Sequence, residues 1–174
     1  MNDVELLSKQ TENAYHWVNK LIDPIPYEKW DNAPEVIETS ITWQVGHLIL
    51  SFYYHTMAVI TGHQKDILEK VPLKEYNDLF GIGSSLKRAT KTDPETLKNR
   101  LVLMEQRSLD TIRSLSSKEL QNDLESTRMP HPVAKNKFEA LDWNIKHTMW
   151  HCGQIAILKR VVDERFDFGW KIES

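Results

Sequence analysis

The feature that most constrains the fold is a helical period in the apolar residues of four long segments. In each segment apolar side chains recur at intervals of three and four residues, which places them on one face of an α-helix. No segment shows a convincing alternation of the kind that predicts a half-buried strand. The segments span about residues 4–21, 40–62, 93–115 and 138–162. Four amphipathic helices bury their stripes most simply against one another, so the sequence predicts an all-α fold, a four-helix bundle.

Helix-breaking and helix-starting residues stand at the ends of these segments. Residues 23–26 contain two prolines, which end the first helix, while Ser40 and Asp93 are good N-caps for the second and third. The connection between the second and third helices is about 30 residues long, which exceeds the usual loop between antiparallel neighbours. A crossover there would let these two helices run parallel. We therefore predict an up-down-down-up order in a single domain over residues 1–174.

The composition indicates a globular protein and argues against nucleic-acid or membrane partners. Of the 174 residues 40% are hydrophobic and 27% are charged, and the net charge of −3 provides no overall positive field. No uncharged apolar run reaches the ~18–20 residues of a membrane-spanning helix, and residues 1–10 do not resemble a secretory signal. The single cysteine, Cys152, cannot form an internal disulfide. We expect a cytoplasmic protein without nucleic-acid or membrane partners.

Histidines on two of the predicted helices suggest a metal site. His147 and His151 are four residues apart, which puts both imidazoles on one side of a helix, about 6 Å apart along its axis. This spacing alone is a weak signal, because surface or packing histidines are the common alternative. His47 lies on the predicted inward stripe of the second helix, between Trp43 and Leu50. Histidines inside a bundle cost desolvation free energy unless their nitrogens are satisfied. We therefore predict that His47, His147 and His151 hold one divalent metal ion.

Other metal-enzyme motifs are missing from the same stretch. Thr148 follows His147 where the H-E-x-x-H metalloproteases have a glutamate, and the paired Glu-x-x-His motifs of di-iron bundles are absent. The pattern favours a mononuclear three-histidine centre with positions open to water or substrate. Imidazole nitrogens suit zinc or nickel, with iron or manganese as alternatives.

Several neighbours of the histidines have two possible roles. Asn144 and Gln154 lie about one turn either side of His151, where each could hydrogen-bond to a ligand ring or simply join two helices. Trp43 and Tyr54, one and two turns from His47, are expected either to line a pocket or to pack in the core.

The other polar features have simpler interpretations. Four further histidines are off the stripe positions and are expected to be exposed: His16, His55, His63 and His131. Of these, His131 precedes the fourth helix and could reach the mouth of the site. Cys152 is interpreted as a buried packing residue rather than a ligand or nucleophile, because it points about 100° away from His151. Residues 81–88 resemble a phosphate loop but lack the G-x4-G-K-[ST] order, so they suggest at most a lid or an anion contact.

Two stretches resemble the signatures of a known family. The residues SITWQVGHL at 40–48 resemble the second-helix signature of the DinB-like four-helix bundle proteins, and HTMWHCGQI at 147–155 resembles their fourth-helix signature. The resemblance covers essentially the whole chain in length and helix order. It implies that His47, His147 and His151 are the metal ligands and that the chain forms a homodimer, as many members of the family do.

The same resemblance implies a class of reaction. Characterised relatives include transferases that use bacillithiol or mycothiol, and a maleylpyruvate isomerase. We therefore expect a metal-dependent, low-molecular-weight thiol S-transferase, with a small-molecule thiol and an electrophile as partners. A metal-dependent hydrolase is the first alternative, although no carboxylate stands at a suitable stripe position to act as its base. A non-catalytic bundle that binds a metal or another ligand is the second, and a fourth protein ligand closing the site would favour it.

Overall fold

The computed structural model describes residues 1–84 and 92–169, and the regular structure in these ranges is helical. Within them the only β-type pairing is one isolated bridge between Asp123 and Asn136. The prediction of an all-α bundle is confirmed. None of the described helices is long and apolar enough to cross a membrane. The α-helices are α1 (Asp3–Ile22), α2 (Ile41–Tyr53), α3 (Val59–Thr61), α4 (Lys65–Lys70), α5 (Leu73–Phe80), α7 (Pro94–Arg113) and α8 (Lys137–Val162).

Side-chain caps fix where the long helices begin. The hydroxyl of Ser40 accepts a hydrogen bond from the backbone N–H of Trp43 at 3.1 Å, and Asp93 caps α7 in the same way with proline at the next position. Both predicted caps are confirmed. Asn136 caps α8 through the backbone N–H of Glu139 at 2.9 Å. The caps satisfy backbone donors that the first turn leaves unpaired.

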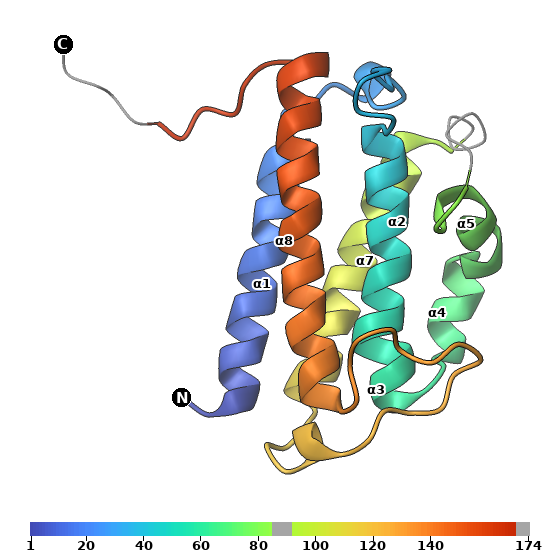
Figure 1. Ribbon diagram of the computed structural model, residues 1–174, viewed down its shortest axis with the longest axis vertical. Coiled ribbons are helices and arrows are strands. Elements are labelled where there is room, and N and C mark those ends of the chain that lie inside the picture. The colour runs from blue at the N-terminus through green and yellow to red at the C-terminus, as the bar shows by residue number, and fades with distance from the viewer. Residues whose placement is uncertain (85–91, 170–174) are drawn as a thin grey trace.

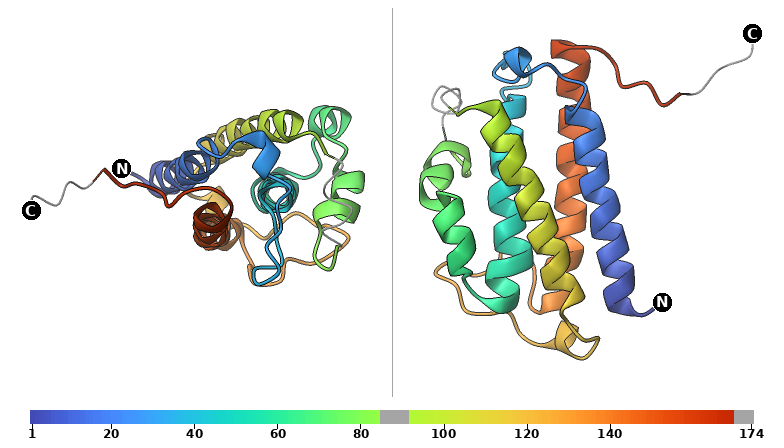
Figure 2. Two further views of the ribbon diagram at one scale, coloured as in Figure 1. Left: turned by 90° about the horizontal axis from the view of Figure 1, so that it is seen from above. Right: turned by 180° about the vertical axis from the view of Figure 1, so that it is seen from behind.

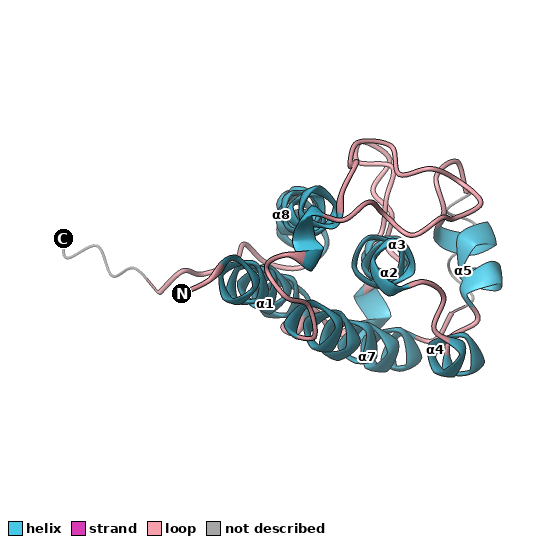
Figure 3. Cartoon of the chain, turned by 90° about the horizontal axis from the view of Figure 1, so that it is seen from below, coloured by secondary structure: helices cyan, strands magenta, loops and turns pink. Residues whose placement is uncertain are grey.

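Four long helices lie side by side, and a shorter helical arm covers part of the bundle (Figure 1). The chain rises through α1, descends through α2 and α3, and rises again through α4 and α5. It then descends through α7 and rises through α8, as the view from behind also shows (Figure 2). The long connection predicted between the second and third helices therefore contains the arm α4–α5. Viewed from below, α4 lies beside α7 and α5 beside α2 (Figure 3).

The face that α2 turns to the core differs from the predicted one. Its fully buried apolar residues include Val45, Ile49 and Phe52. Of the stripe predicted to face inward, Met57 is fully buried, while four members are only partly buried: Trp43, His47, Leu50 and Tyr54. The stripe assignment was wrong at these positions, because α2 is apolar on both flanks and spacing alone does not say which flank faces the core. His47 itself lies where α2 meets α8.

The end of α2 departs from regular α-helix geometry. Residues Tyr54–Ala58 form a π-helical segment before α3 begins. A wider turn moves side chains out of the 3.6-residue register on which spacing arguments rest. The register inferred from His47 therefore does not extend beyond Tyr54.

The arm packs closely against α2 at a glycine. A Cβ at Gly46 would lie 2.3 Å from the ring of Phe80, the last residue of α5. Only glycine lets the two helices come this near without displacing the buried ring. The contact also brings the backbone of Phe80 next to the neighbouring His47.

Candidate metal centre

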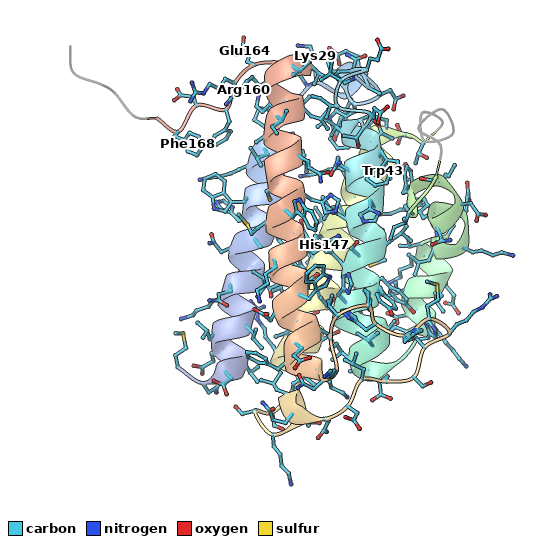
Figure 4. All side chains as sticks on the ribbon, viewed as in Figure 1. Lys29, Trp43, His147, Arg160, Glu164 and Phe168 are labelled. Atoms are coloured by element: carbon cyan, nitrogen blue, oxygen red, sulfur yellow. The ribbon has the colours of Figure 1, made fainter. Side chains whose placement is uncertain are left out.

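Two of the long helices bring three histidines together. His47 comes from α2, and His147 and His151 come from successive turns of α8. Figure 4 labels His147, which lies on the side of α8 facing α2. One nitrogen from each ring lies within 4.8 Å of a nitrogen from the others, and among the described residues this is the only group of three or more side chains arranged to hold a metal ion. The predicted convergence of the three rings is confirmed.

The outer ring nitrogens are held by hydrogen bonds that select a tautomer. Nδ1 of His47 lies 2.9 Å from the carbonyl oxygen of Phe80, and Nδ1 of His151 lies 2.5 Å from Oε1 of Gln44. Each oxygen can only accept, so each Nδ1 carries the hydrogen and Nε2 keeps a lone pair. This is the arrangement in which a histidine offers Nε2 to a metal ion.

A small amide network keeps Gln44 in this orientation. The Nε2 group of Gln44 donates to Oε1 of Gln154 at 2.7 Å and to the hydroxyl of Thr39 at 3.1 Å. With both amide hydrogens engaged, Oε1 is left facing His151. Gln154 therefore supports the site indirectly, while Asn144 donates to the Tyr15 hydroxyl in the core and is a helix-contact residue.

The inner nitrogens fit a cation. Nε2 of His147 lies 3.1 Å from Nε2 of His151, and two lone pairs at this distance repel unless a proton or a cation lies between them. An ion with tetrahedral bonds of about 2.0–2.1 Å holds two nitrogens roughly 3.3 Å apart. Nδ1 of His147 is buried without a hydrogen-bond partner in the described part of the chain. The donor set and its spacing both suit a divalent metal.

Burial keeps the three rings neutral. It lowers the pKa of His47, partly offset by the carbonyl of Phe80. Burial, reinforced by the neighbouring histidines, lowers the pKa of His147 to about 4 and that of His151 to about 3. Neutral imidazole is the form that ligates metals, so all three side chains are ready to bind at neutral pH.

Comparison with protein-family models matches residues 10–155 to the DinB superfamily. This match covers well over half of the chain and includes all three histidines. The chain belongs to the DinB superfamily. No curated protein matches the sequence.

Aromatic rings flank the histidines of this DinB-superfamily site. Trp43 stacks on His47 with centroids 4.8 Å apart and planes 9° apart, and its indole N–H donates to the Ser84 hydroxyl at 2.9 Å. Trp143 stacks on His147 at 6.0 Å. Of the two aromatic residues considered from the sequence, Trp43 therefore walls the site. Tyr54 stacks on His131 instead.

Two of the remaining histidines are exposed as predicted, His16 and His63. The prediction for His55 was wrong: it is 6% exposed, lies against His147 and hydrogen-bonds to His131. Spacing missed it because it sits on the π-helical segment, beyond the register set by His47. Gln44 was also missed, although its place one turn before His47 was a usable signal.

Cys152 is a packing residue, as predicted. It is 5% exposed within the main apolar cluster, and burial raises the pKa of its thiol to about 12. A thiol in that state is a poor nucleophile at neutral pH, and Cys152 is not among the side chains that converge on the candidate metal position. The stretch that resembled a phosphate loop is described only to Ser84, and its Lys87 and Arg88 lie outside the described residues.

Proposed function

We propose that this DinB-superfamily protein binds one divalent metal ion through His47, His147 and His151. With the ion bound, the protein acts as a thiol S-transferase. The observation that carries the proposal is the tautomer pattern: the outer nitrogens of two rings are hydrogen-bonded, while the inner nitrogens converge. Such orientation by outer hydrogen bonds is usual for metal-binding histidines. Zinc or nickel suits this all-nitrogen donor set best.

The charge of the donor set favours thiol chemistry. All three histidines are neutral, so an ion held by them keeps its full positive charge and lowers the pKa of a thiol that ligates to it. The chain itself would fix the ring orientations through Gln44 and Phe80 and shield one side of the centre with Trp43. A low-molecular-weight thiol of the bacillithiol or mycothiol type, with a small electrophile, is the substrate class that the family resemblance supports.

The alternatives are supported less well. Structural zinc ions are commonly enclosed by four protein ligands, whereas the cluster in the described residues has three, which favours a site that admits a small molecule. A hydrolase needs a base beside the bound water. None of the contacts described for the three rings involves a carboxylate. We also propose, from the family resemblance alone, a cytoplasmic homodimer.

Metal analysis of protein purified without a histidine tag tests the proposal. We expect about one equivalent of metal per chain, loss of that metal in His147→Ala, and no loss in His16→Ala, which changes an exposed histidine outside the site. Low-molecular-weight thiols should then raise the melting temperature of the metal-loaded protein but not of His147→Ala. Protein that neither retains metal nor gains stability from added zinc or nickel would rule out a metal enzyme.

A further inference from the structure

Two histidines outside the triad extend the site toward the loop that precedes α8. His55, on the π-helical segment, stands nearly perpendicular to His147, with ring centroids 5.5 Å apart and planes 70° apart. His131 lies in the loop, and its Nε2 is 2.8 Å from Nδ1 of His55. π-Helical turns are uncommon and recur at functional sites, so the placement of His55 on one is a reason to ask what it does.

The hydrogen bonds of His131 determine where its proton is. The backbone N–H groups of Ala134 and Val133 donate to Nδ1 of His131 at 2.8 and 3.3 Å. Nδ1 must therefore be unprotonated, and the single hydrogen of the neutral ring is on Nε2. A cationic ring would place a third donor against these two backbone donors. Because its only lone pair is already used, His131 is not a metal ligand.

The same reasoning continues to His55. Nε2–H of His131 donates to Nδ1 of His55, so the hydrogen of the neutral His55 ring is on its Nε2. That N–H lies on the other edge of the ring from the loop. No hydrogen bond to it is described, and it is not among the fully buried atoms that lack a partner, so a ligand or water can reach it. A protonated Nε2 has no lone pair for a metal, so His55 is a fixed donor rather than a fourth ligand.

His147 presents a second donor without an acceptor. When Nε2 of His147 ligates the metal, the neutral ring carries its hydrogen on Nδ1. This atom is buried and has no hydrogen-bond partner among the described residues. Two adjacent imidazoles thus offer N–H groups without a described acceptor, of which that of His147 is fully buried. Buried donors of this kind cost free energy unless a ligand or water accepts from them. An oxyanion of a molecule bound at the site would accept from the accessible N–H of His55, and hydrogen bonds to a charged acceptor are the stronger kind.

We propose that His55, oriented by His131, binds a carboxylate of the molecule that enters the metal centre. The inference rests on the proposed function, because it assumes a metal at the triad, and it adds a class of substrate: a carboxylate-bearing thiol or electrophile. His55 is a binding residue in this scheme. His131 acts through it and is a positioning residue.

The first test needs no metal. Two-bond 1H–15N correlation spectra of the metal-free protein report which nitrogen of each neutral ring carries the hydrogen. We expect the Nε2–H form for both His55 and His131, and a mixture of tautomers at His55 in His131→Ala. His131→Gln should restore the Nε2–H form, since its amide can both accept from the backbone and donate to Nδ1. A predominant Nδ1–H form of His55 in the unmodified protein would overturn the proposal.

The second test measures binding to the cobalt-substituted protein by its visible spectrum. The probes are 2-mercaptoethanol and mercaptoacetate, which share a thiol and differ by a carboxylate. We expect His55→Phe to weaken mercaptoacetate about tenfold and leave 2-mercaptoethanol unchanged, which corresponds to ~1.4 kcal/mol. His55→Gln, which keeps a donor, should retain most of the affinity, and His16→Ala all of it. A preference for mercaptoacetate that survives in His55→Phe comes from chelation by the metal and shows that His55 does not bind the carboxylate of the thiol.

Three further outcomes separate the possible failures. Acetate can be added as a competitor of thiol binding. If its competition depends on His55 while mercaptoacetate binding does not, the carboxylate that His55 binds belongs to the electrophile. The proposal then stands in that form. If the protein takes up no cobalt, the proposed function fails, and the tautomer spectra still decide whether His55 is a fixed donor. If it takes up cobalt and neither carboxylate depends on His55, the inference alone fails.

Discussion

Gln44 shows how one uncharged residue can orient a candidate metal ligand. Its carbonyl oxygen accepts from Nδ1 of His151, and its amide hydrogens are bonded to Gln154 and Thr39. The ring of His151 is therefore oriented by a side chain that is itself fixed on three sides. Partners of this kind set both the tautomer and the basicity of a ligating imidazole.

Replacing Gln44 should weaken metal binding without removing a ligand. Gln44→Leu leaves Nδ1 of His151 without an acceptor, and we expect metal affinity to fall about 10- to 100-fold. Gln44→Glu keeps an acceptor and should retain the affinity or increase it. Competition with a chelating dye measures both. Equal affinities for Gln44→Leu and the unmodified protein would show that the hydrogen bond does not orient the ring.

Glu105 gives the protein a stability that depends on pH. This α7 carboxylate is 8% exposed, and burial raises its pKa to about 7, although Asn19 donates to both its oxygens and Lys98 lies nearby. The folded state then holds a proton that the unfolded state loses above its ordinary pKa of 4.5. The free energy of unfolding should therefore fall as the pH rises from about 4.5 to about 7, and level off above that.

Glu105→Gln isolates this effect. The amide resembles the protonated acid and can still accept from Asn19. We expect it to stabilise the protein by about 2 kcal/mol at about pH 8, with little change at about pH 4. Urea unfolding at several pH values measures the difference. A variant whose stability follows the same pH dependence as the unmodified protein would assign that dependence to other groups.

At the scale of elements, the contact between α2 and α5 determines where the acceptor of His47 lies. Gly46 permits the approach of Phe80, and the carbonyl of Phe80 then meets Nδ1 of His47. The packing of α5 against α2 therefore also fixes the orientation of His47, a candidate metal ligand. A side chain at position 46 should disturb both.

The two helical glycines outside the turns make a matched pair for this prediction. Gly46→Ala places a Cβ against the buried Phe80 ring, and we expect a loss of about 1–3 kcal/mol in stability together with weaker metal binding. Gly153→Ala, on α8, meets nothing within 4 Å and should stabilise the helix by roughly 0.5–1 kcal/mol. Thermal or urea unfolding compares them. Stabilisation by both substitutions would mean that α5 can move away from α2 at this contact with little cost in free energy.

The sequence located the helices more accurately than it identified which face of each helix is buried. Periodicity and caps located the long helices, and the spacing of His147 and His151 together with His47 located the site, because these signals are local. The core face of α2 was misassigned because both flanks are apolar. The role of His55 was missed because no local signal marks a π-helical turn. Pairing of Gln44 with His151 depends on how two distant helices are rotated, which spacing does not specify.

At the scale of the whole molecule, the site and the apolar core are largely separate. The core is built from fully buried residues such as Val18, Ile49, Phe52 and Leu101, whereas His47 and His147 are only partly buried where α2 meets α8. Burial of the apolar residues stabilises the bundle regardless of what the histidines hold. The metal should therefore add stability to a fold that exists without it.

Removing the metal should lower the melting temperature but leave the helices in place. Dialysis against a chelator should keep the helical circular dichroism signal within a few per cent of its value, while the melting temperature falls and recovers on adding the ion, by linkage of binding to folding. His147→Ala should melt at the same temperature with and without the chelator. Loss of helical signal on chelation would show that the metal is needed to form the bundle.

The acceptor for His47 belongs to the main chain, and this has a consequence for how the site can vary. Every amino acid at position 80 carries a carbonyl, so a point mutation there cannot delete the acceptor and can only relocate it. By contrast, one codon change at Gln44 removes the acceptor for His151 outright. A single substitution can therefore remove the hydrogen-bond acceptor of His151 directly, but it can affect the acceptor of His47 only by moving α5. The length and packing of the arm, including the buried ring of Phe80, therefore determine whether His47 keeps its acceptor.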